Sequence, residues 1–348
     1  MKYATSLIIL ACAIMTACTK VKKMRSFPDT AGDAKSTITA AEIAWLEQMA
    51  EHDRDSMRIS DSLRAATGQT DGNSLFHKKN KMIAIVEVND HYFPNVNCYV
   101  DENGKPMFDL AFPFSANMNI DPATGKAYVS YNPEHQAMLR LGIFDKVRNA
   151  GVPVGLSLLG NHDDAGWNNF KTLEDATAFA QVVAREVRQK HFAAILSDDE
   201  YSNYVSNAHP ASYVMVMSEI KRLLPATYLC YYVYGAGSTP YNGKKMGDVA
   251  DAAFGAFYPQ YPDNSFLTTF GFTKDKWFPS CSETDGGFSN PEGTAKQVVT
   301  DGLGGIMFYN VWARPDFYSP YLLGLKGKKL NVSAGCLNPH QQDFINGR

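Results

Sequence analysis

The chain has 348 residues, and its 33 Lys and Arg against 36 Asp and Glu give a formal net charge of −3 at pH 7. This balance argues against a nucleic-acid-binding protein, which is usually basic. Hydrophobic residues make up 45% and charged residues 20% of the chain, which is typical of a folded globular protein and excludes a disordered one. The length allows about two domains or a single α/β barrel.

The N-terminus has the features of an export signal. An apolar run from Ala4 to Ala17 is too short to span a membrane and ends in small residues directly before Cys18. This pattern resembles a bacterial lipoprotein cleavage site, with a plain secretion signal or a soluble N-terminus as the alternatives. We therefore expect a signal peptide over residues 1–17, a lipid on Cys18 and a polar tether over residues 18–37. The lipid alone would hold the protein to the outer membrane of the cell envelope, on a side that the sequence leaves open.

Four cysteines follow this segment: Cys98, Cys230, Cys281 and Cys336. They allow three pairings, and the sequence does not choose among them. In a chain of this length we expect free, buried thiols. No C-x-x-C pair occurs, which excludes a zinc ribbon, and we expect neither a metal nor another cofactor.

Residues 38–80 are expected to form an N-terminal helix and a linker. Thr39 and Glu42 have the spacing of a capping box, which predicts the start of a helix. Apolar residues then recur at helical spacing to about Ala66. A cluster of Gly, Asp and Asn over residues 68–73 predicts its end.

From Lys81 onward, short apolar runs alternate with helical patterns. The predicted strands are Met82–Val88, Phe108–Phe114, Val152–Leu159, Phe192–Ser197, Tyr228–Tyr234, Ala252–Tyr258, Trp277–Ser280 and Ile306–Asn310. Helical patterns lie at residues 133–149, after Thr172 and at residues 213–224. This alternation predicts an α/β fold with a parallel sheet, and eight candidate strands favour a TIM (β/α)8 barrel over an open doubly wound sheet. We assign the barrel to residues 81–330 and a C-terminal tail to residues 331–348.

Two carboxylates lie in register after the fourth predicted strand. In a barrel, chemistry takes place at the carboxyl ends of the strands. Side chains alternate along a strand, so Asp198 and Glu200 share one face while Asp199 points the other way. Two neighbouring carboxyl groups with different proton affinities suit the hydrolysis of a glycosidic bond. A solvated acidic loop is the alternative.

Longer motifs extend this observation. VEVND at 86–90, LSLLGNHDDAGW at 156–167, SDDEYSNY at 197–204 and GGIMFYNV at 304–311 each follow or contain a predicted strand. Together they resemble glycoside hydrolase family 18, specifically the bacterial endo-β-N-acetylglucosaminidases of the Endo H and Endo F type, from about Met82 to Leu323. The resemblance implies cleavage between the two core GlcNAc residues of N-linked glycans, with N-glycans or glycoproteins as partners.

The resemblance also implies a role for each carboxylate. Glu200 would be the general acid and then the base, while the 2-acetamido oxygen of the substrate attacks the anomeric carbon. Asp198 would orient the acetamide and stabilise the oxazolinium ion, so no second nucleophile and no metal is required. Further candidates for substrate binding are Asn89, Asn161, His162, Tyr201, Gln260, Tyr309 and Asn310.

The chain departs from the family near these carboxylates. The family pattern is D-G-x-D-x-D-x-E, and this chain has Ala193 and Leu196 in place of its first two Asp residues. Phe254 stands where relatives often carry a Tyr, whose hydroxyl Tyr258 or Gln260 would have to replace. Two hypotheses therefore stay open: an active hydrolase, and a glycan-binding lipoprotein that has lost turnover.

Overall fold

The computed structural model describes residues 38–67, 75–234, 236–333 and 336–337. The strands are β1 (Lys81–Glu87), β2 (Tyr99–Asp101), β3 (Leu110–Phe114), β4 (Ala116–Ile120), β5 (Ala127–Tyr131), β6 (Gly155–Asn161), β7 (Ala194–Tyr201), β8 (Tyr228–Val233), β9 (Ala252–Gly255), β10 (Trp277–Phe278), β11 (Ser280–Ser282), β12 (Gly305–Tyr309) and β13 (Leu330–Val332). The helices are α2 (Ala40–Thr67), α3 (Pro133–Arg140), α4 (Ile143–Asn149), α5 (Leu173–Gln189), α6 (Ser212–Leu223), α7 (Met246–Val249), α8 (Asn264–Phe270), α9 (Pro291–Asp301) and α10 (Pro315–Lys326), with 3₁₀ turns at Phe93–Cys98 and Lys274–Lys276.

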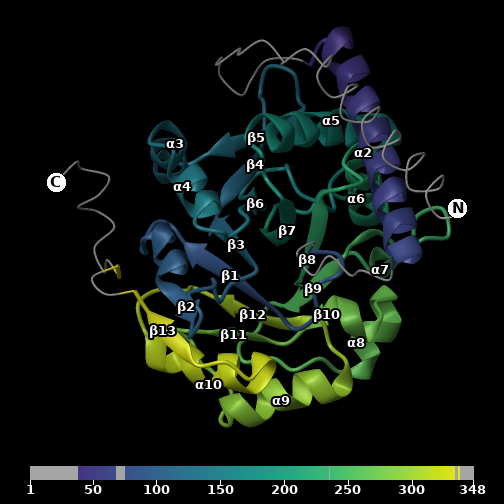
Figure 1. The fold of residues 1–348 in the computed structure, drawn as a ribbon. Helices are drawn as coiled ribbons and strands as arrows, with labels where there is room; N and C mark the ends of the chain where they lie inside the picture. The colour runs from purple at the N-terminus through teal and green to yellow at the C-terminus, as the bar shows by residue number, and fades with distance from the viewer. Residues whose placement is uncertain (1–37, 68–74, 235, 334–335, 338–348) are drawn as a thin grey trace, which may run out of the picture. The chain divides into compact units, whose positions relative to one another are not determined.

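The central strands form a parallel barrel. One sheet has the order β11-β12-β1-β3, and a second has the order β10-β9-β8-β7-β6-β4-β5. Only Ser115 separates β3 from β4, and only Pro279 separates β10 from β11. Residues 110–120 and residues 277–282 therefore each contribute one strand to each sheet and join the two sheets. In the described chain, eight strand positions therefore follow one another in a ring, with helices outside them (Figure 1). The TIM-barrel prediction is confirmed.

Alternation along the strands creates two apolar layers. Ile83 and Ile85 of β1 belong to an inner cluster drawn almost wholly from strand residues. Met82 and Ala84 of the same strand belong to an outer cluster shared with the helices. Because successive side chains point to opposite faces, one strand fills both layers.

Several predicted boundaries differ from the structure. The single helix predicted over residues 133–149 is two helices, because Gly142 between them adopts a left-handed φ of 63°. The predicted strand 277–280 is interrupted at Pro279, which has no N–H for a ladder. The antiparallel pair β4 and β5 was not predicted and extends the sheet outside the ring.

Helix α2 packs on the outside of the barrel. Its start is confirmed as a capping box, since the Thr39 N–H donates to the Glu42 carboxylate (2.7 Å) and the Glu42 N–H donates to Thr39 Oγ1 (3.2 Å). Ion pairs join Glu47 to Arg222 of α6 and Asp53 to Arg188 of α5. None of the helices described is both long and apolar enough to cross a membrane. The predicted signal peptide, Cys18 and the tether lie outside the described residues.

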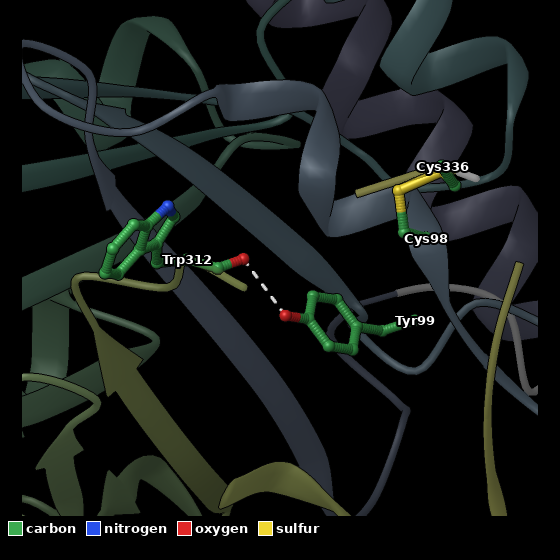
Figure 2. Close-up of a disulfide and its surroundings, with 4 residues drawn as sticks. All are labelled: Cys98, Tyr99, Trp312 and Cys336. Atoms are coloured by element: carbon green, nitrogen blue, oxygen red, sulfur yellow. Dashed lines mark hydrogen bonds between the residues drawn. A yellow bond between two sulfur atoms is a disulfide. The ribbon is translucent and has the colours of Figure 1, made fainter. Parts of the chain in front are cut away.

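A disulfide joins Cys98 to Cys336, 238 residues further along the chain (Figure 2). The expectation of free thiols is wrong for this pair, because β13 pairs with β2 and brings the two Cα atoms to 5.6 Å. Cys230 and Cys281 are free and buried, as predicted. Beside the bridge, the Tyr99 hydroxyl donates to the carbonyl oxygen of Trp312 (3.0 Å), just beyond β12.

Candidate active site

Strand β7 directs alternate side chains into the barrel. Leu196 belongs to the inner cluster and Ile195 to the outer one, so Asp198 and Glu200 face the interior at the carboxyl end. The Glu200 N–H donates to Asp198 Oδ1 at 3.0 Å. The predicted pairing of these two carboxylates on one face is present in the structure.

Asp198 is almost completely buried and only half satisfied. Its Oδ1 accepts the Glu200 N–H, whereas its Oδ2 has no hydrogen-bond partner among the described residues. Burial raises the pKa of Asp198 to about 8, and the charges of Glu200 and Asp199 add to the rise. When Asp198 is in its charged form, an incoming N–H donor would find a buried oxygen ready to accept it.

Glu200 is half-buried at the mouth of the barrel. Burial raises the pKa of its carboxyl group, while its interaction with Tyr201 opposes the rise. A raised pKa keeps the proton available closer to neutral pH, which is what a general acid requires. Burial thus raises the pKa of both members of the pair, and Asp198 is the more deeply buried of the two.

Two tyrosines lie close to this pair. Tyr258 and Tyr309 stack with ring centroids 5.3 Å apart. Burial raises the pKa of both hydroxyls, and the charges of Asp198 and Glu200 contribute to each rise. The Tyr309 hydroxyl donates to Glu87 Oε2 (2.7 Å), whereas the buried Tyr258 hydroxyl has no partner among the described residues.

Glu87 is the site residue that the sequence analysis missed. It ends β1, and burial raises the pKa of its carboxyl group. Asn89 Nδ2 donates to Glu87 Oε1 (3.3 Å), and Asn132 Nδ2 donates in turn to Asn89 Oδ1 (3.1 Å). Glu87 stood within the VEVND motif at a strand end, which was the signal that could have identified it.

Other predicted site residues lie at the ends of neighbouring strands. Asn161 ends β6 in register with Tyr201 of β7. His162 has a left-handed φ of 58°, donates its N–H to the Tyr201 carbonyl oxygen (2.9 Å) and packs its ring 5.0 Å from the Tyr201 ring. These three residues therefore form a group beside Glu200.

Gln260 and Asn310 form separate contacts. The Gln260 side chain fills the space over Gly255, where a Cβ would lie 1.9 Å from Gln260 Oε1. Asn310 Nδ2 contacts Thr284 Oγ1 at 3.4 Å, and Asn310 Oδ1 is buried without a partner among the described residues. No hydrogen bond described for either residue reaches Asp198 or Glu200.

Two residues that depart from the family pattern, Leu196 and Phe254, lie in apolar surroundings. Leu196 is fully buried in the inner cluster, two residues before Asp198 on the same face. Phe254 is also fully buried and meets Phe278 edge to face. At the base of the site, Leu196 therefore places packed hydrocarbon where the family pattern has a carboxylate, and Phe254 places an apolar ring where relatives often have a tyrosine hydroxyl. Among the residues described, no three His, Cys, Asp or Glu side chains form a group that could hold a metal ion.

Comparison with known proteins identifies the family. The chain is 31% identical over 278 residues to endo-β-N-acetylglucosaminidase F1 of Elizabethkingia meningoseptica, a match over 75% of this chain and 79% of that protein. The chain belongs to the endo-β-N-acetylglucosaminidases of glycoside hydrolase family 18. The resemblance in the sequence is thereby confirmed, and the protein is an endoglycosidase-like hydrolase.

Two further comparisons support this family 18 assignment. The endo-β-N-acetylglucosaminidase of Flavobacterium sp. (strain SK1022) is 31% identical over 254 residues, or 69% of this chain and 77% of that protein. The solved structure of EndoBT-3987 from Bacteroides thetaiotamicron with a Man5GlcNAc product matches with a TM-score of 0.63 and 25% identity, over 73% of this chain. The match covers 62% of that solved chain, so this chain spans less than two thirds of it. A scan against models of protein families found no match.

Proposed function

We propose that this family 18 hydrolase cleaves the bond between the two core GlcNAc residues of N-linked glycans by substrate-assisted, retaining catalysis. The observation that carries the proposal is the pairing of Asp198 and Glu200, with an unpartnered oxygen on Asp198 and an unpartnered hydroxyl on Tyr258 beside it. A 2-acetamido group offers an N–H and a carbonyl oxygen, which are the complements of these two atoms. The EndoBT-3987 structure holds Man5GlcNAc, a product with a single GlcNAc.

In the first step Glu200 donates its proton to the glycosidic oxygen. The acetamido oxygen of the substrate attacks the anomeric carbon as the bond to the leaving sugar breaks, which gives an oxazolinium ion. Water then attacks the same carbon and gives its proton to Glu200, so the acid is restored and the configuration is retained.

Asp198 acts on the acetamide. The N–H of that group donates to Asp198 Oδ2, the oxygen for which none of the described residues supplies a donor. Burial favours the neutral form of Asp198, but the positive charge that develops on the oxazolinium ion favours the charged form. Tyr258 is the candidate donor to the acetamido oxygen, because the hydroxyl of Tyr309 already serves Glu87.

Leu196 favours a second candidate function, which is glycan binding without turnover. With hydrocarbon beneath Asp198, no second carboxyl group shares its proton from below. The protein would then hold the acetamido sugar without driving the attack.

Release of glycan from glycoproteins tests the two functions together. The chain from Thr19 onward is incubated with high-mannose and complex-type glycoproteins beside Glu200→Gln, and the products are measured by mass spectrometry. Free glycan with one reducing GlcNAc, absent with Glu200→Gln, supports the hydrolase. Equal release by both proteins would show that Glu200 is not the general acid. Binding without release would favour the second function, and Leu196→Asp should then raise turnover from a low base.

We also propose that a lipid on Cys18 anchors the protein in the outer membrane. Support comes from the apolar run and the small residues before Cys18, and from the Cys98–Cys336 disulfide, since disulfides persist in exported proteins. Labelling with a fatty acid in an exporting bacterium should mark the protein, and Cys18→Ala should lose the label and leave the membrane fraction. Label retained by Cys18→Ala would contradict the anchor.

A further inference from the structure

Four exposed aromatic side chains lie at the carboxyl ends of consecutive barrel strands, and we name them the aromatic rim. They are Tyr201 (44% exposed), Tyr204 (61%), Tyr234 (38%) and Phe257 (64%). Tyr201 ends β7, Tyr234 follows β8 and Phe257 follows β9. Most other rings of the described chain are buried in the two apolar layers.

One ring contact and electrostatic interactions link the side chains of the aromatic rim. The rings of Tyr234 and Phe257 stack with centroids 5.8 Å apart and planes inclined by 27°. Tyr234 also lies near enough to Tyr201 and Tyr204 to raise the pKa of both hydroxyls, behind the larger effects of Glu200 on Tyr201 and of burial on Tyr204. The four rings are therefore one small apolar patch with three hydroxyl groups.

The aromatic rim begins at Glu200. The charge of Glu200 is the largest cause of the raised pKa of Tyr201, which follows it in the chain. Glu200 thus stands between two kinds of surface. On its buried side are Asp198 and Tyr258, which carry the unpartnered polar atoms, and on its exposed side is the aromatic rim.

We propose that the aromatic rim binds the leaving-group sugar, the GlcNAc that stays on asparagine, by stacking against its ring. This inference rests on the proposed function. The oxygen that Glu200 protonates joins the two sugars, so the acetamido sugar held at Asp198 and the leaving sugar lie on opposite sides of Glu200. The buried side has the complements of an acetamide, which leaves the exposed side for the second sugar.

The size and chemistry of the aromatic rim match one sugar ring. A stable protein partner needs about 800 Å² and roughly 20–30 residues on each side, far more than four side chains. A pyranose has an apolar face that packs on an aromatic ring, as nucleic-acid bases do on aromatic platforms, and hydroxyls at its edge. The Tyr204 hydroxyl already donates to the Asp199 carbonyl oxygen (3.4 Å) and the Tyr201 hydroxyl interacts with Glu200, so the Tyr234 hydroxyl is the candidate to exchange hydrogen bonds with that edge.

The test distinguishes binding of the leaving sugar from binding of the acetamido sugar. Phe257→Ala and Tyr234→Ala are assayed on a GlcNAc2-asparagine glycan and on the corresponding glycan oxazoline, which has no leaving sugar. We expect kcat/KM for the glycan to fall about tenfold, mainly through KM, and to fall at least fivefold further than the rate of oxazoline hydrolysis. Val299→Ala, an exposed apolar residue on α9, is the matched control.

Equal losses on both substrates, or no loss on the glycan, would overturn the inference while leaving the proposed function intact. If wild-type protein releases no glycan, the proposed function fails, and the aromatic rim is then tested by binding. GlcNAc-asparagine is titrated into Glu200→Gln, with and without Phe257→Ala, and followed by NMR. Weaker binding with Phe257→Ala supports the aromatic rim, and unchanged binding contradicts it.

Discussion

Two carboxyl groups at the end of β7, one on the inward face and one on the outward face, have different hydrogen-bond partners. Asp198 and Asp199 are neighbours, both almost fully buried, and burial is the first cause of the raised pKa of each. On the outward face, Asp199 accepts hydrogen bonds from the Trp167 N–H (2.8 Å), Asn168 Nδ2 (2.7 Å) and the Ser202 hydroxyl. On the inward face, Asp198 accepts one hydrogen bond from the part of the chain that the structure describes, and its Oδ2 has no donor there.

This difference indicates a structural role for Asp199 and a ligand-binding role for Asp198. A buried carboxyl group with all its donors holds a loop in place, here the loop after β6. A buried carboxyl group that lacks a donor costs stability, and such a cost is expected where a ligand supplies the missing group. Four predictions test this difference between Asp198 and Asp199.

The largest expected effect is on the stability of Asp198→Asn at high pH. The raised pKa means that the folded protein keeps the proton up to about pH 8, whereas the unfolded chain releases it near pH 4. The free energy of unfolding of wild type therefore falls as pH rises through this window. The amide that replaces the carboxyl group does not titrate, so Asp198→Asn should be more stable than wild type at pH 8.5 by roughly 3–5 kcal/mol. Urea unfolding at pH 8.5 and at pH 4 measures it, and a gain of equal size at pH 4 would contradict the cause.

The same substitution should cost turnover. Asp198→Asn retains the shape of the side chain and an oxygen that can accept the acetamide N–H, but it has no negative charge to balance the positive oxazolinium ion. We expect kcat to fall about 10²–10³-fold, measured by glycan release. Activity that matches wild type would show that the negative charge of Asp198 has no role in the reaction.

Asp199→Ala should reverse the pattern. It leaves three donors without their acceptor, so the free energy of unfolding should fall by about 3 kcal/mol. The kcat of the protein that remains folded should change by less than about threefold. Thermal unfolding and glycan release on one sample measure both effects, and a loss of kcat as large as that of Asp198→Asn would erase the distinction between the two faces.

The smallest effect is expected from the tyrosine pair. Tyr258→Phe removes the hydroxyl without a partner and should lower kcat about tenfold, since one lost hydrogen bond is worth about 1.4 kcal/mol. Tyr309→Phe is the matched control, because the Tyr309 hydroxyl of wild type already donates a hydrogen bond to Glu87. A greater loss of kcat in Tyr309→Phe would assign the acetamide contact to Tyr309 instead.

Much of this architecture was predictable from local patterns. The alternation of side chains that paired Asp198 with Glu200 depends on strand geometry alone and needs no tertiary information. The capping box of α2 is equally local. The eight strand positions also follow from the sequence, because the central strands are buried on both faces and most of them contain a continuous apolar run.

What could not be predicted depends on contacts between distant segments. The Glu87–Tyr309 hydrogen bond joins residues 222 positions apart, across the seam where β1 meets β12. The Cys98–Cys336 pairing follows from the β2–β13 ladder, and three-residue strands have no pattern of their own. The aromatic rim was hidden because Tyr234 and Phe257 end apolar runs, where a sequence alone does not distinguish a buried ring from an exposed one.

The Cys98–Cys336 disulfide also determines what a protease can release. Seven of the eight barrel strand positions lie between these two cysteines, and only β1 precedes them. A single cut in any loop between Cys98 and Cys336 leaves two fragments that the bridge still joins. The nicked protein would migrate as one species on a non-reducing gel and separate into two only after the bridge is reduced.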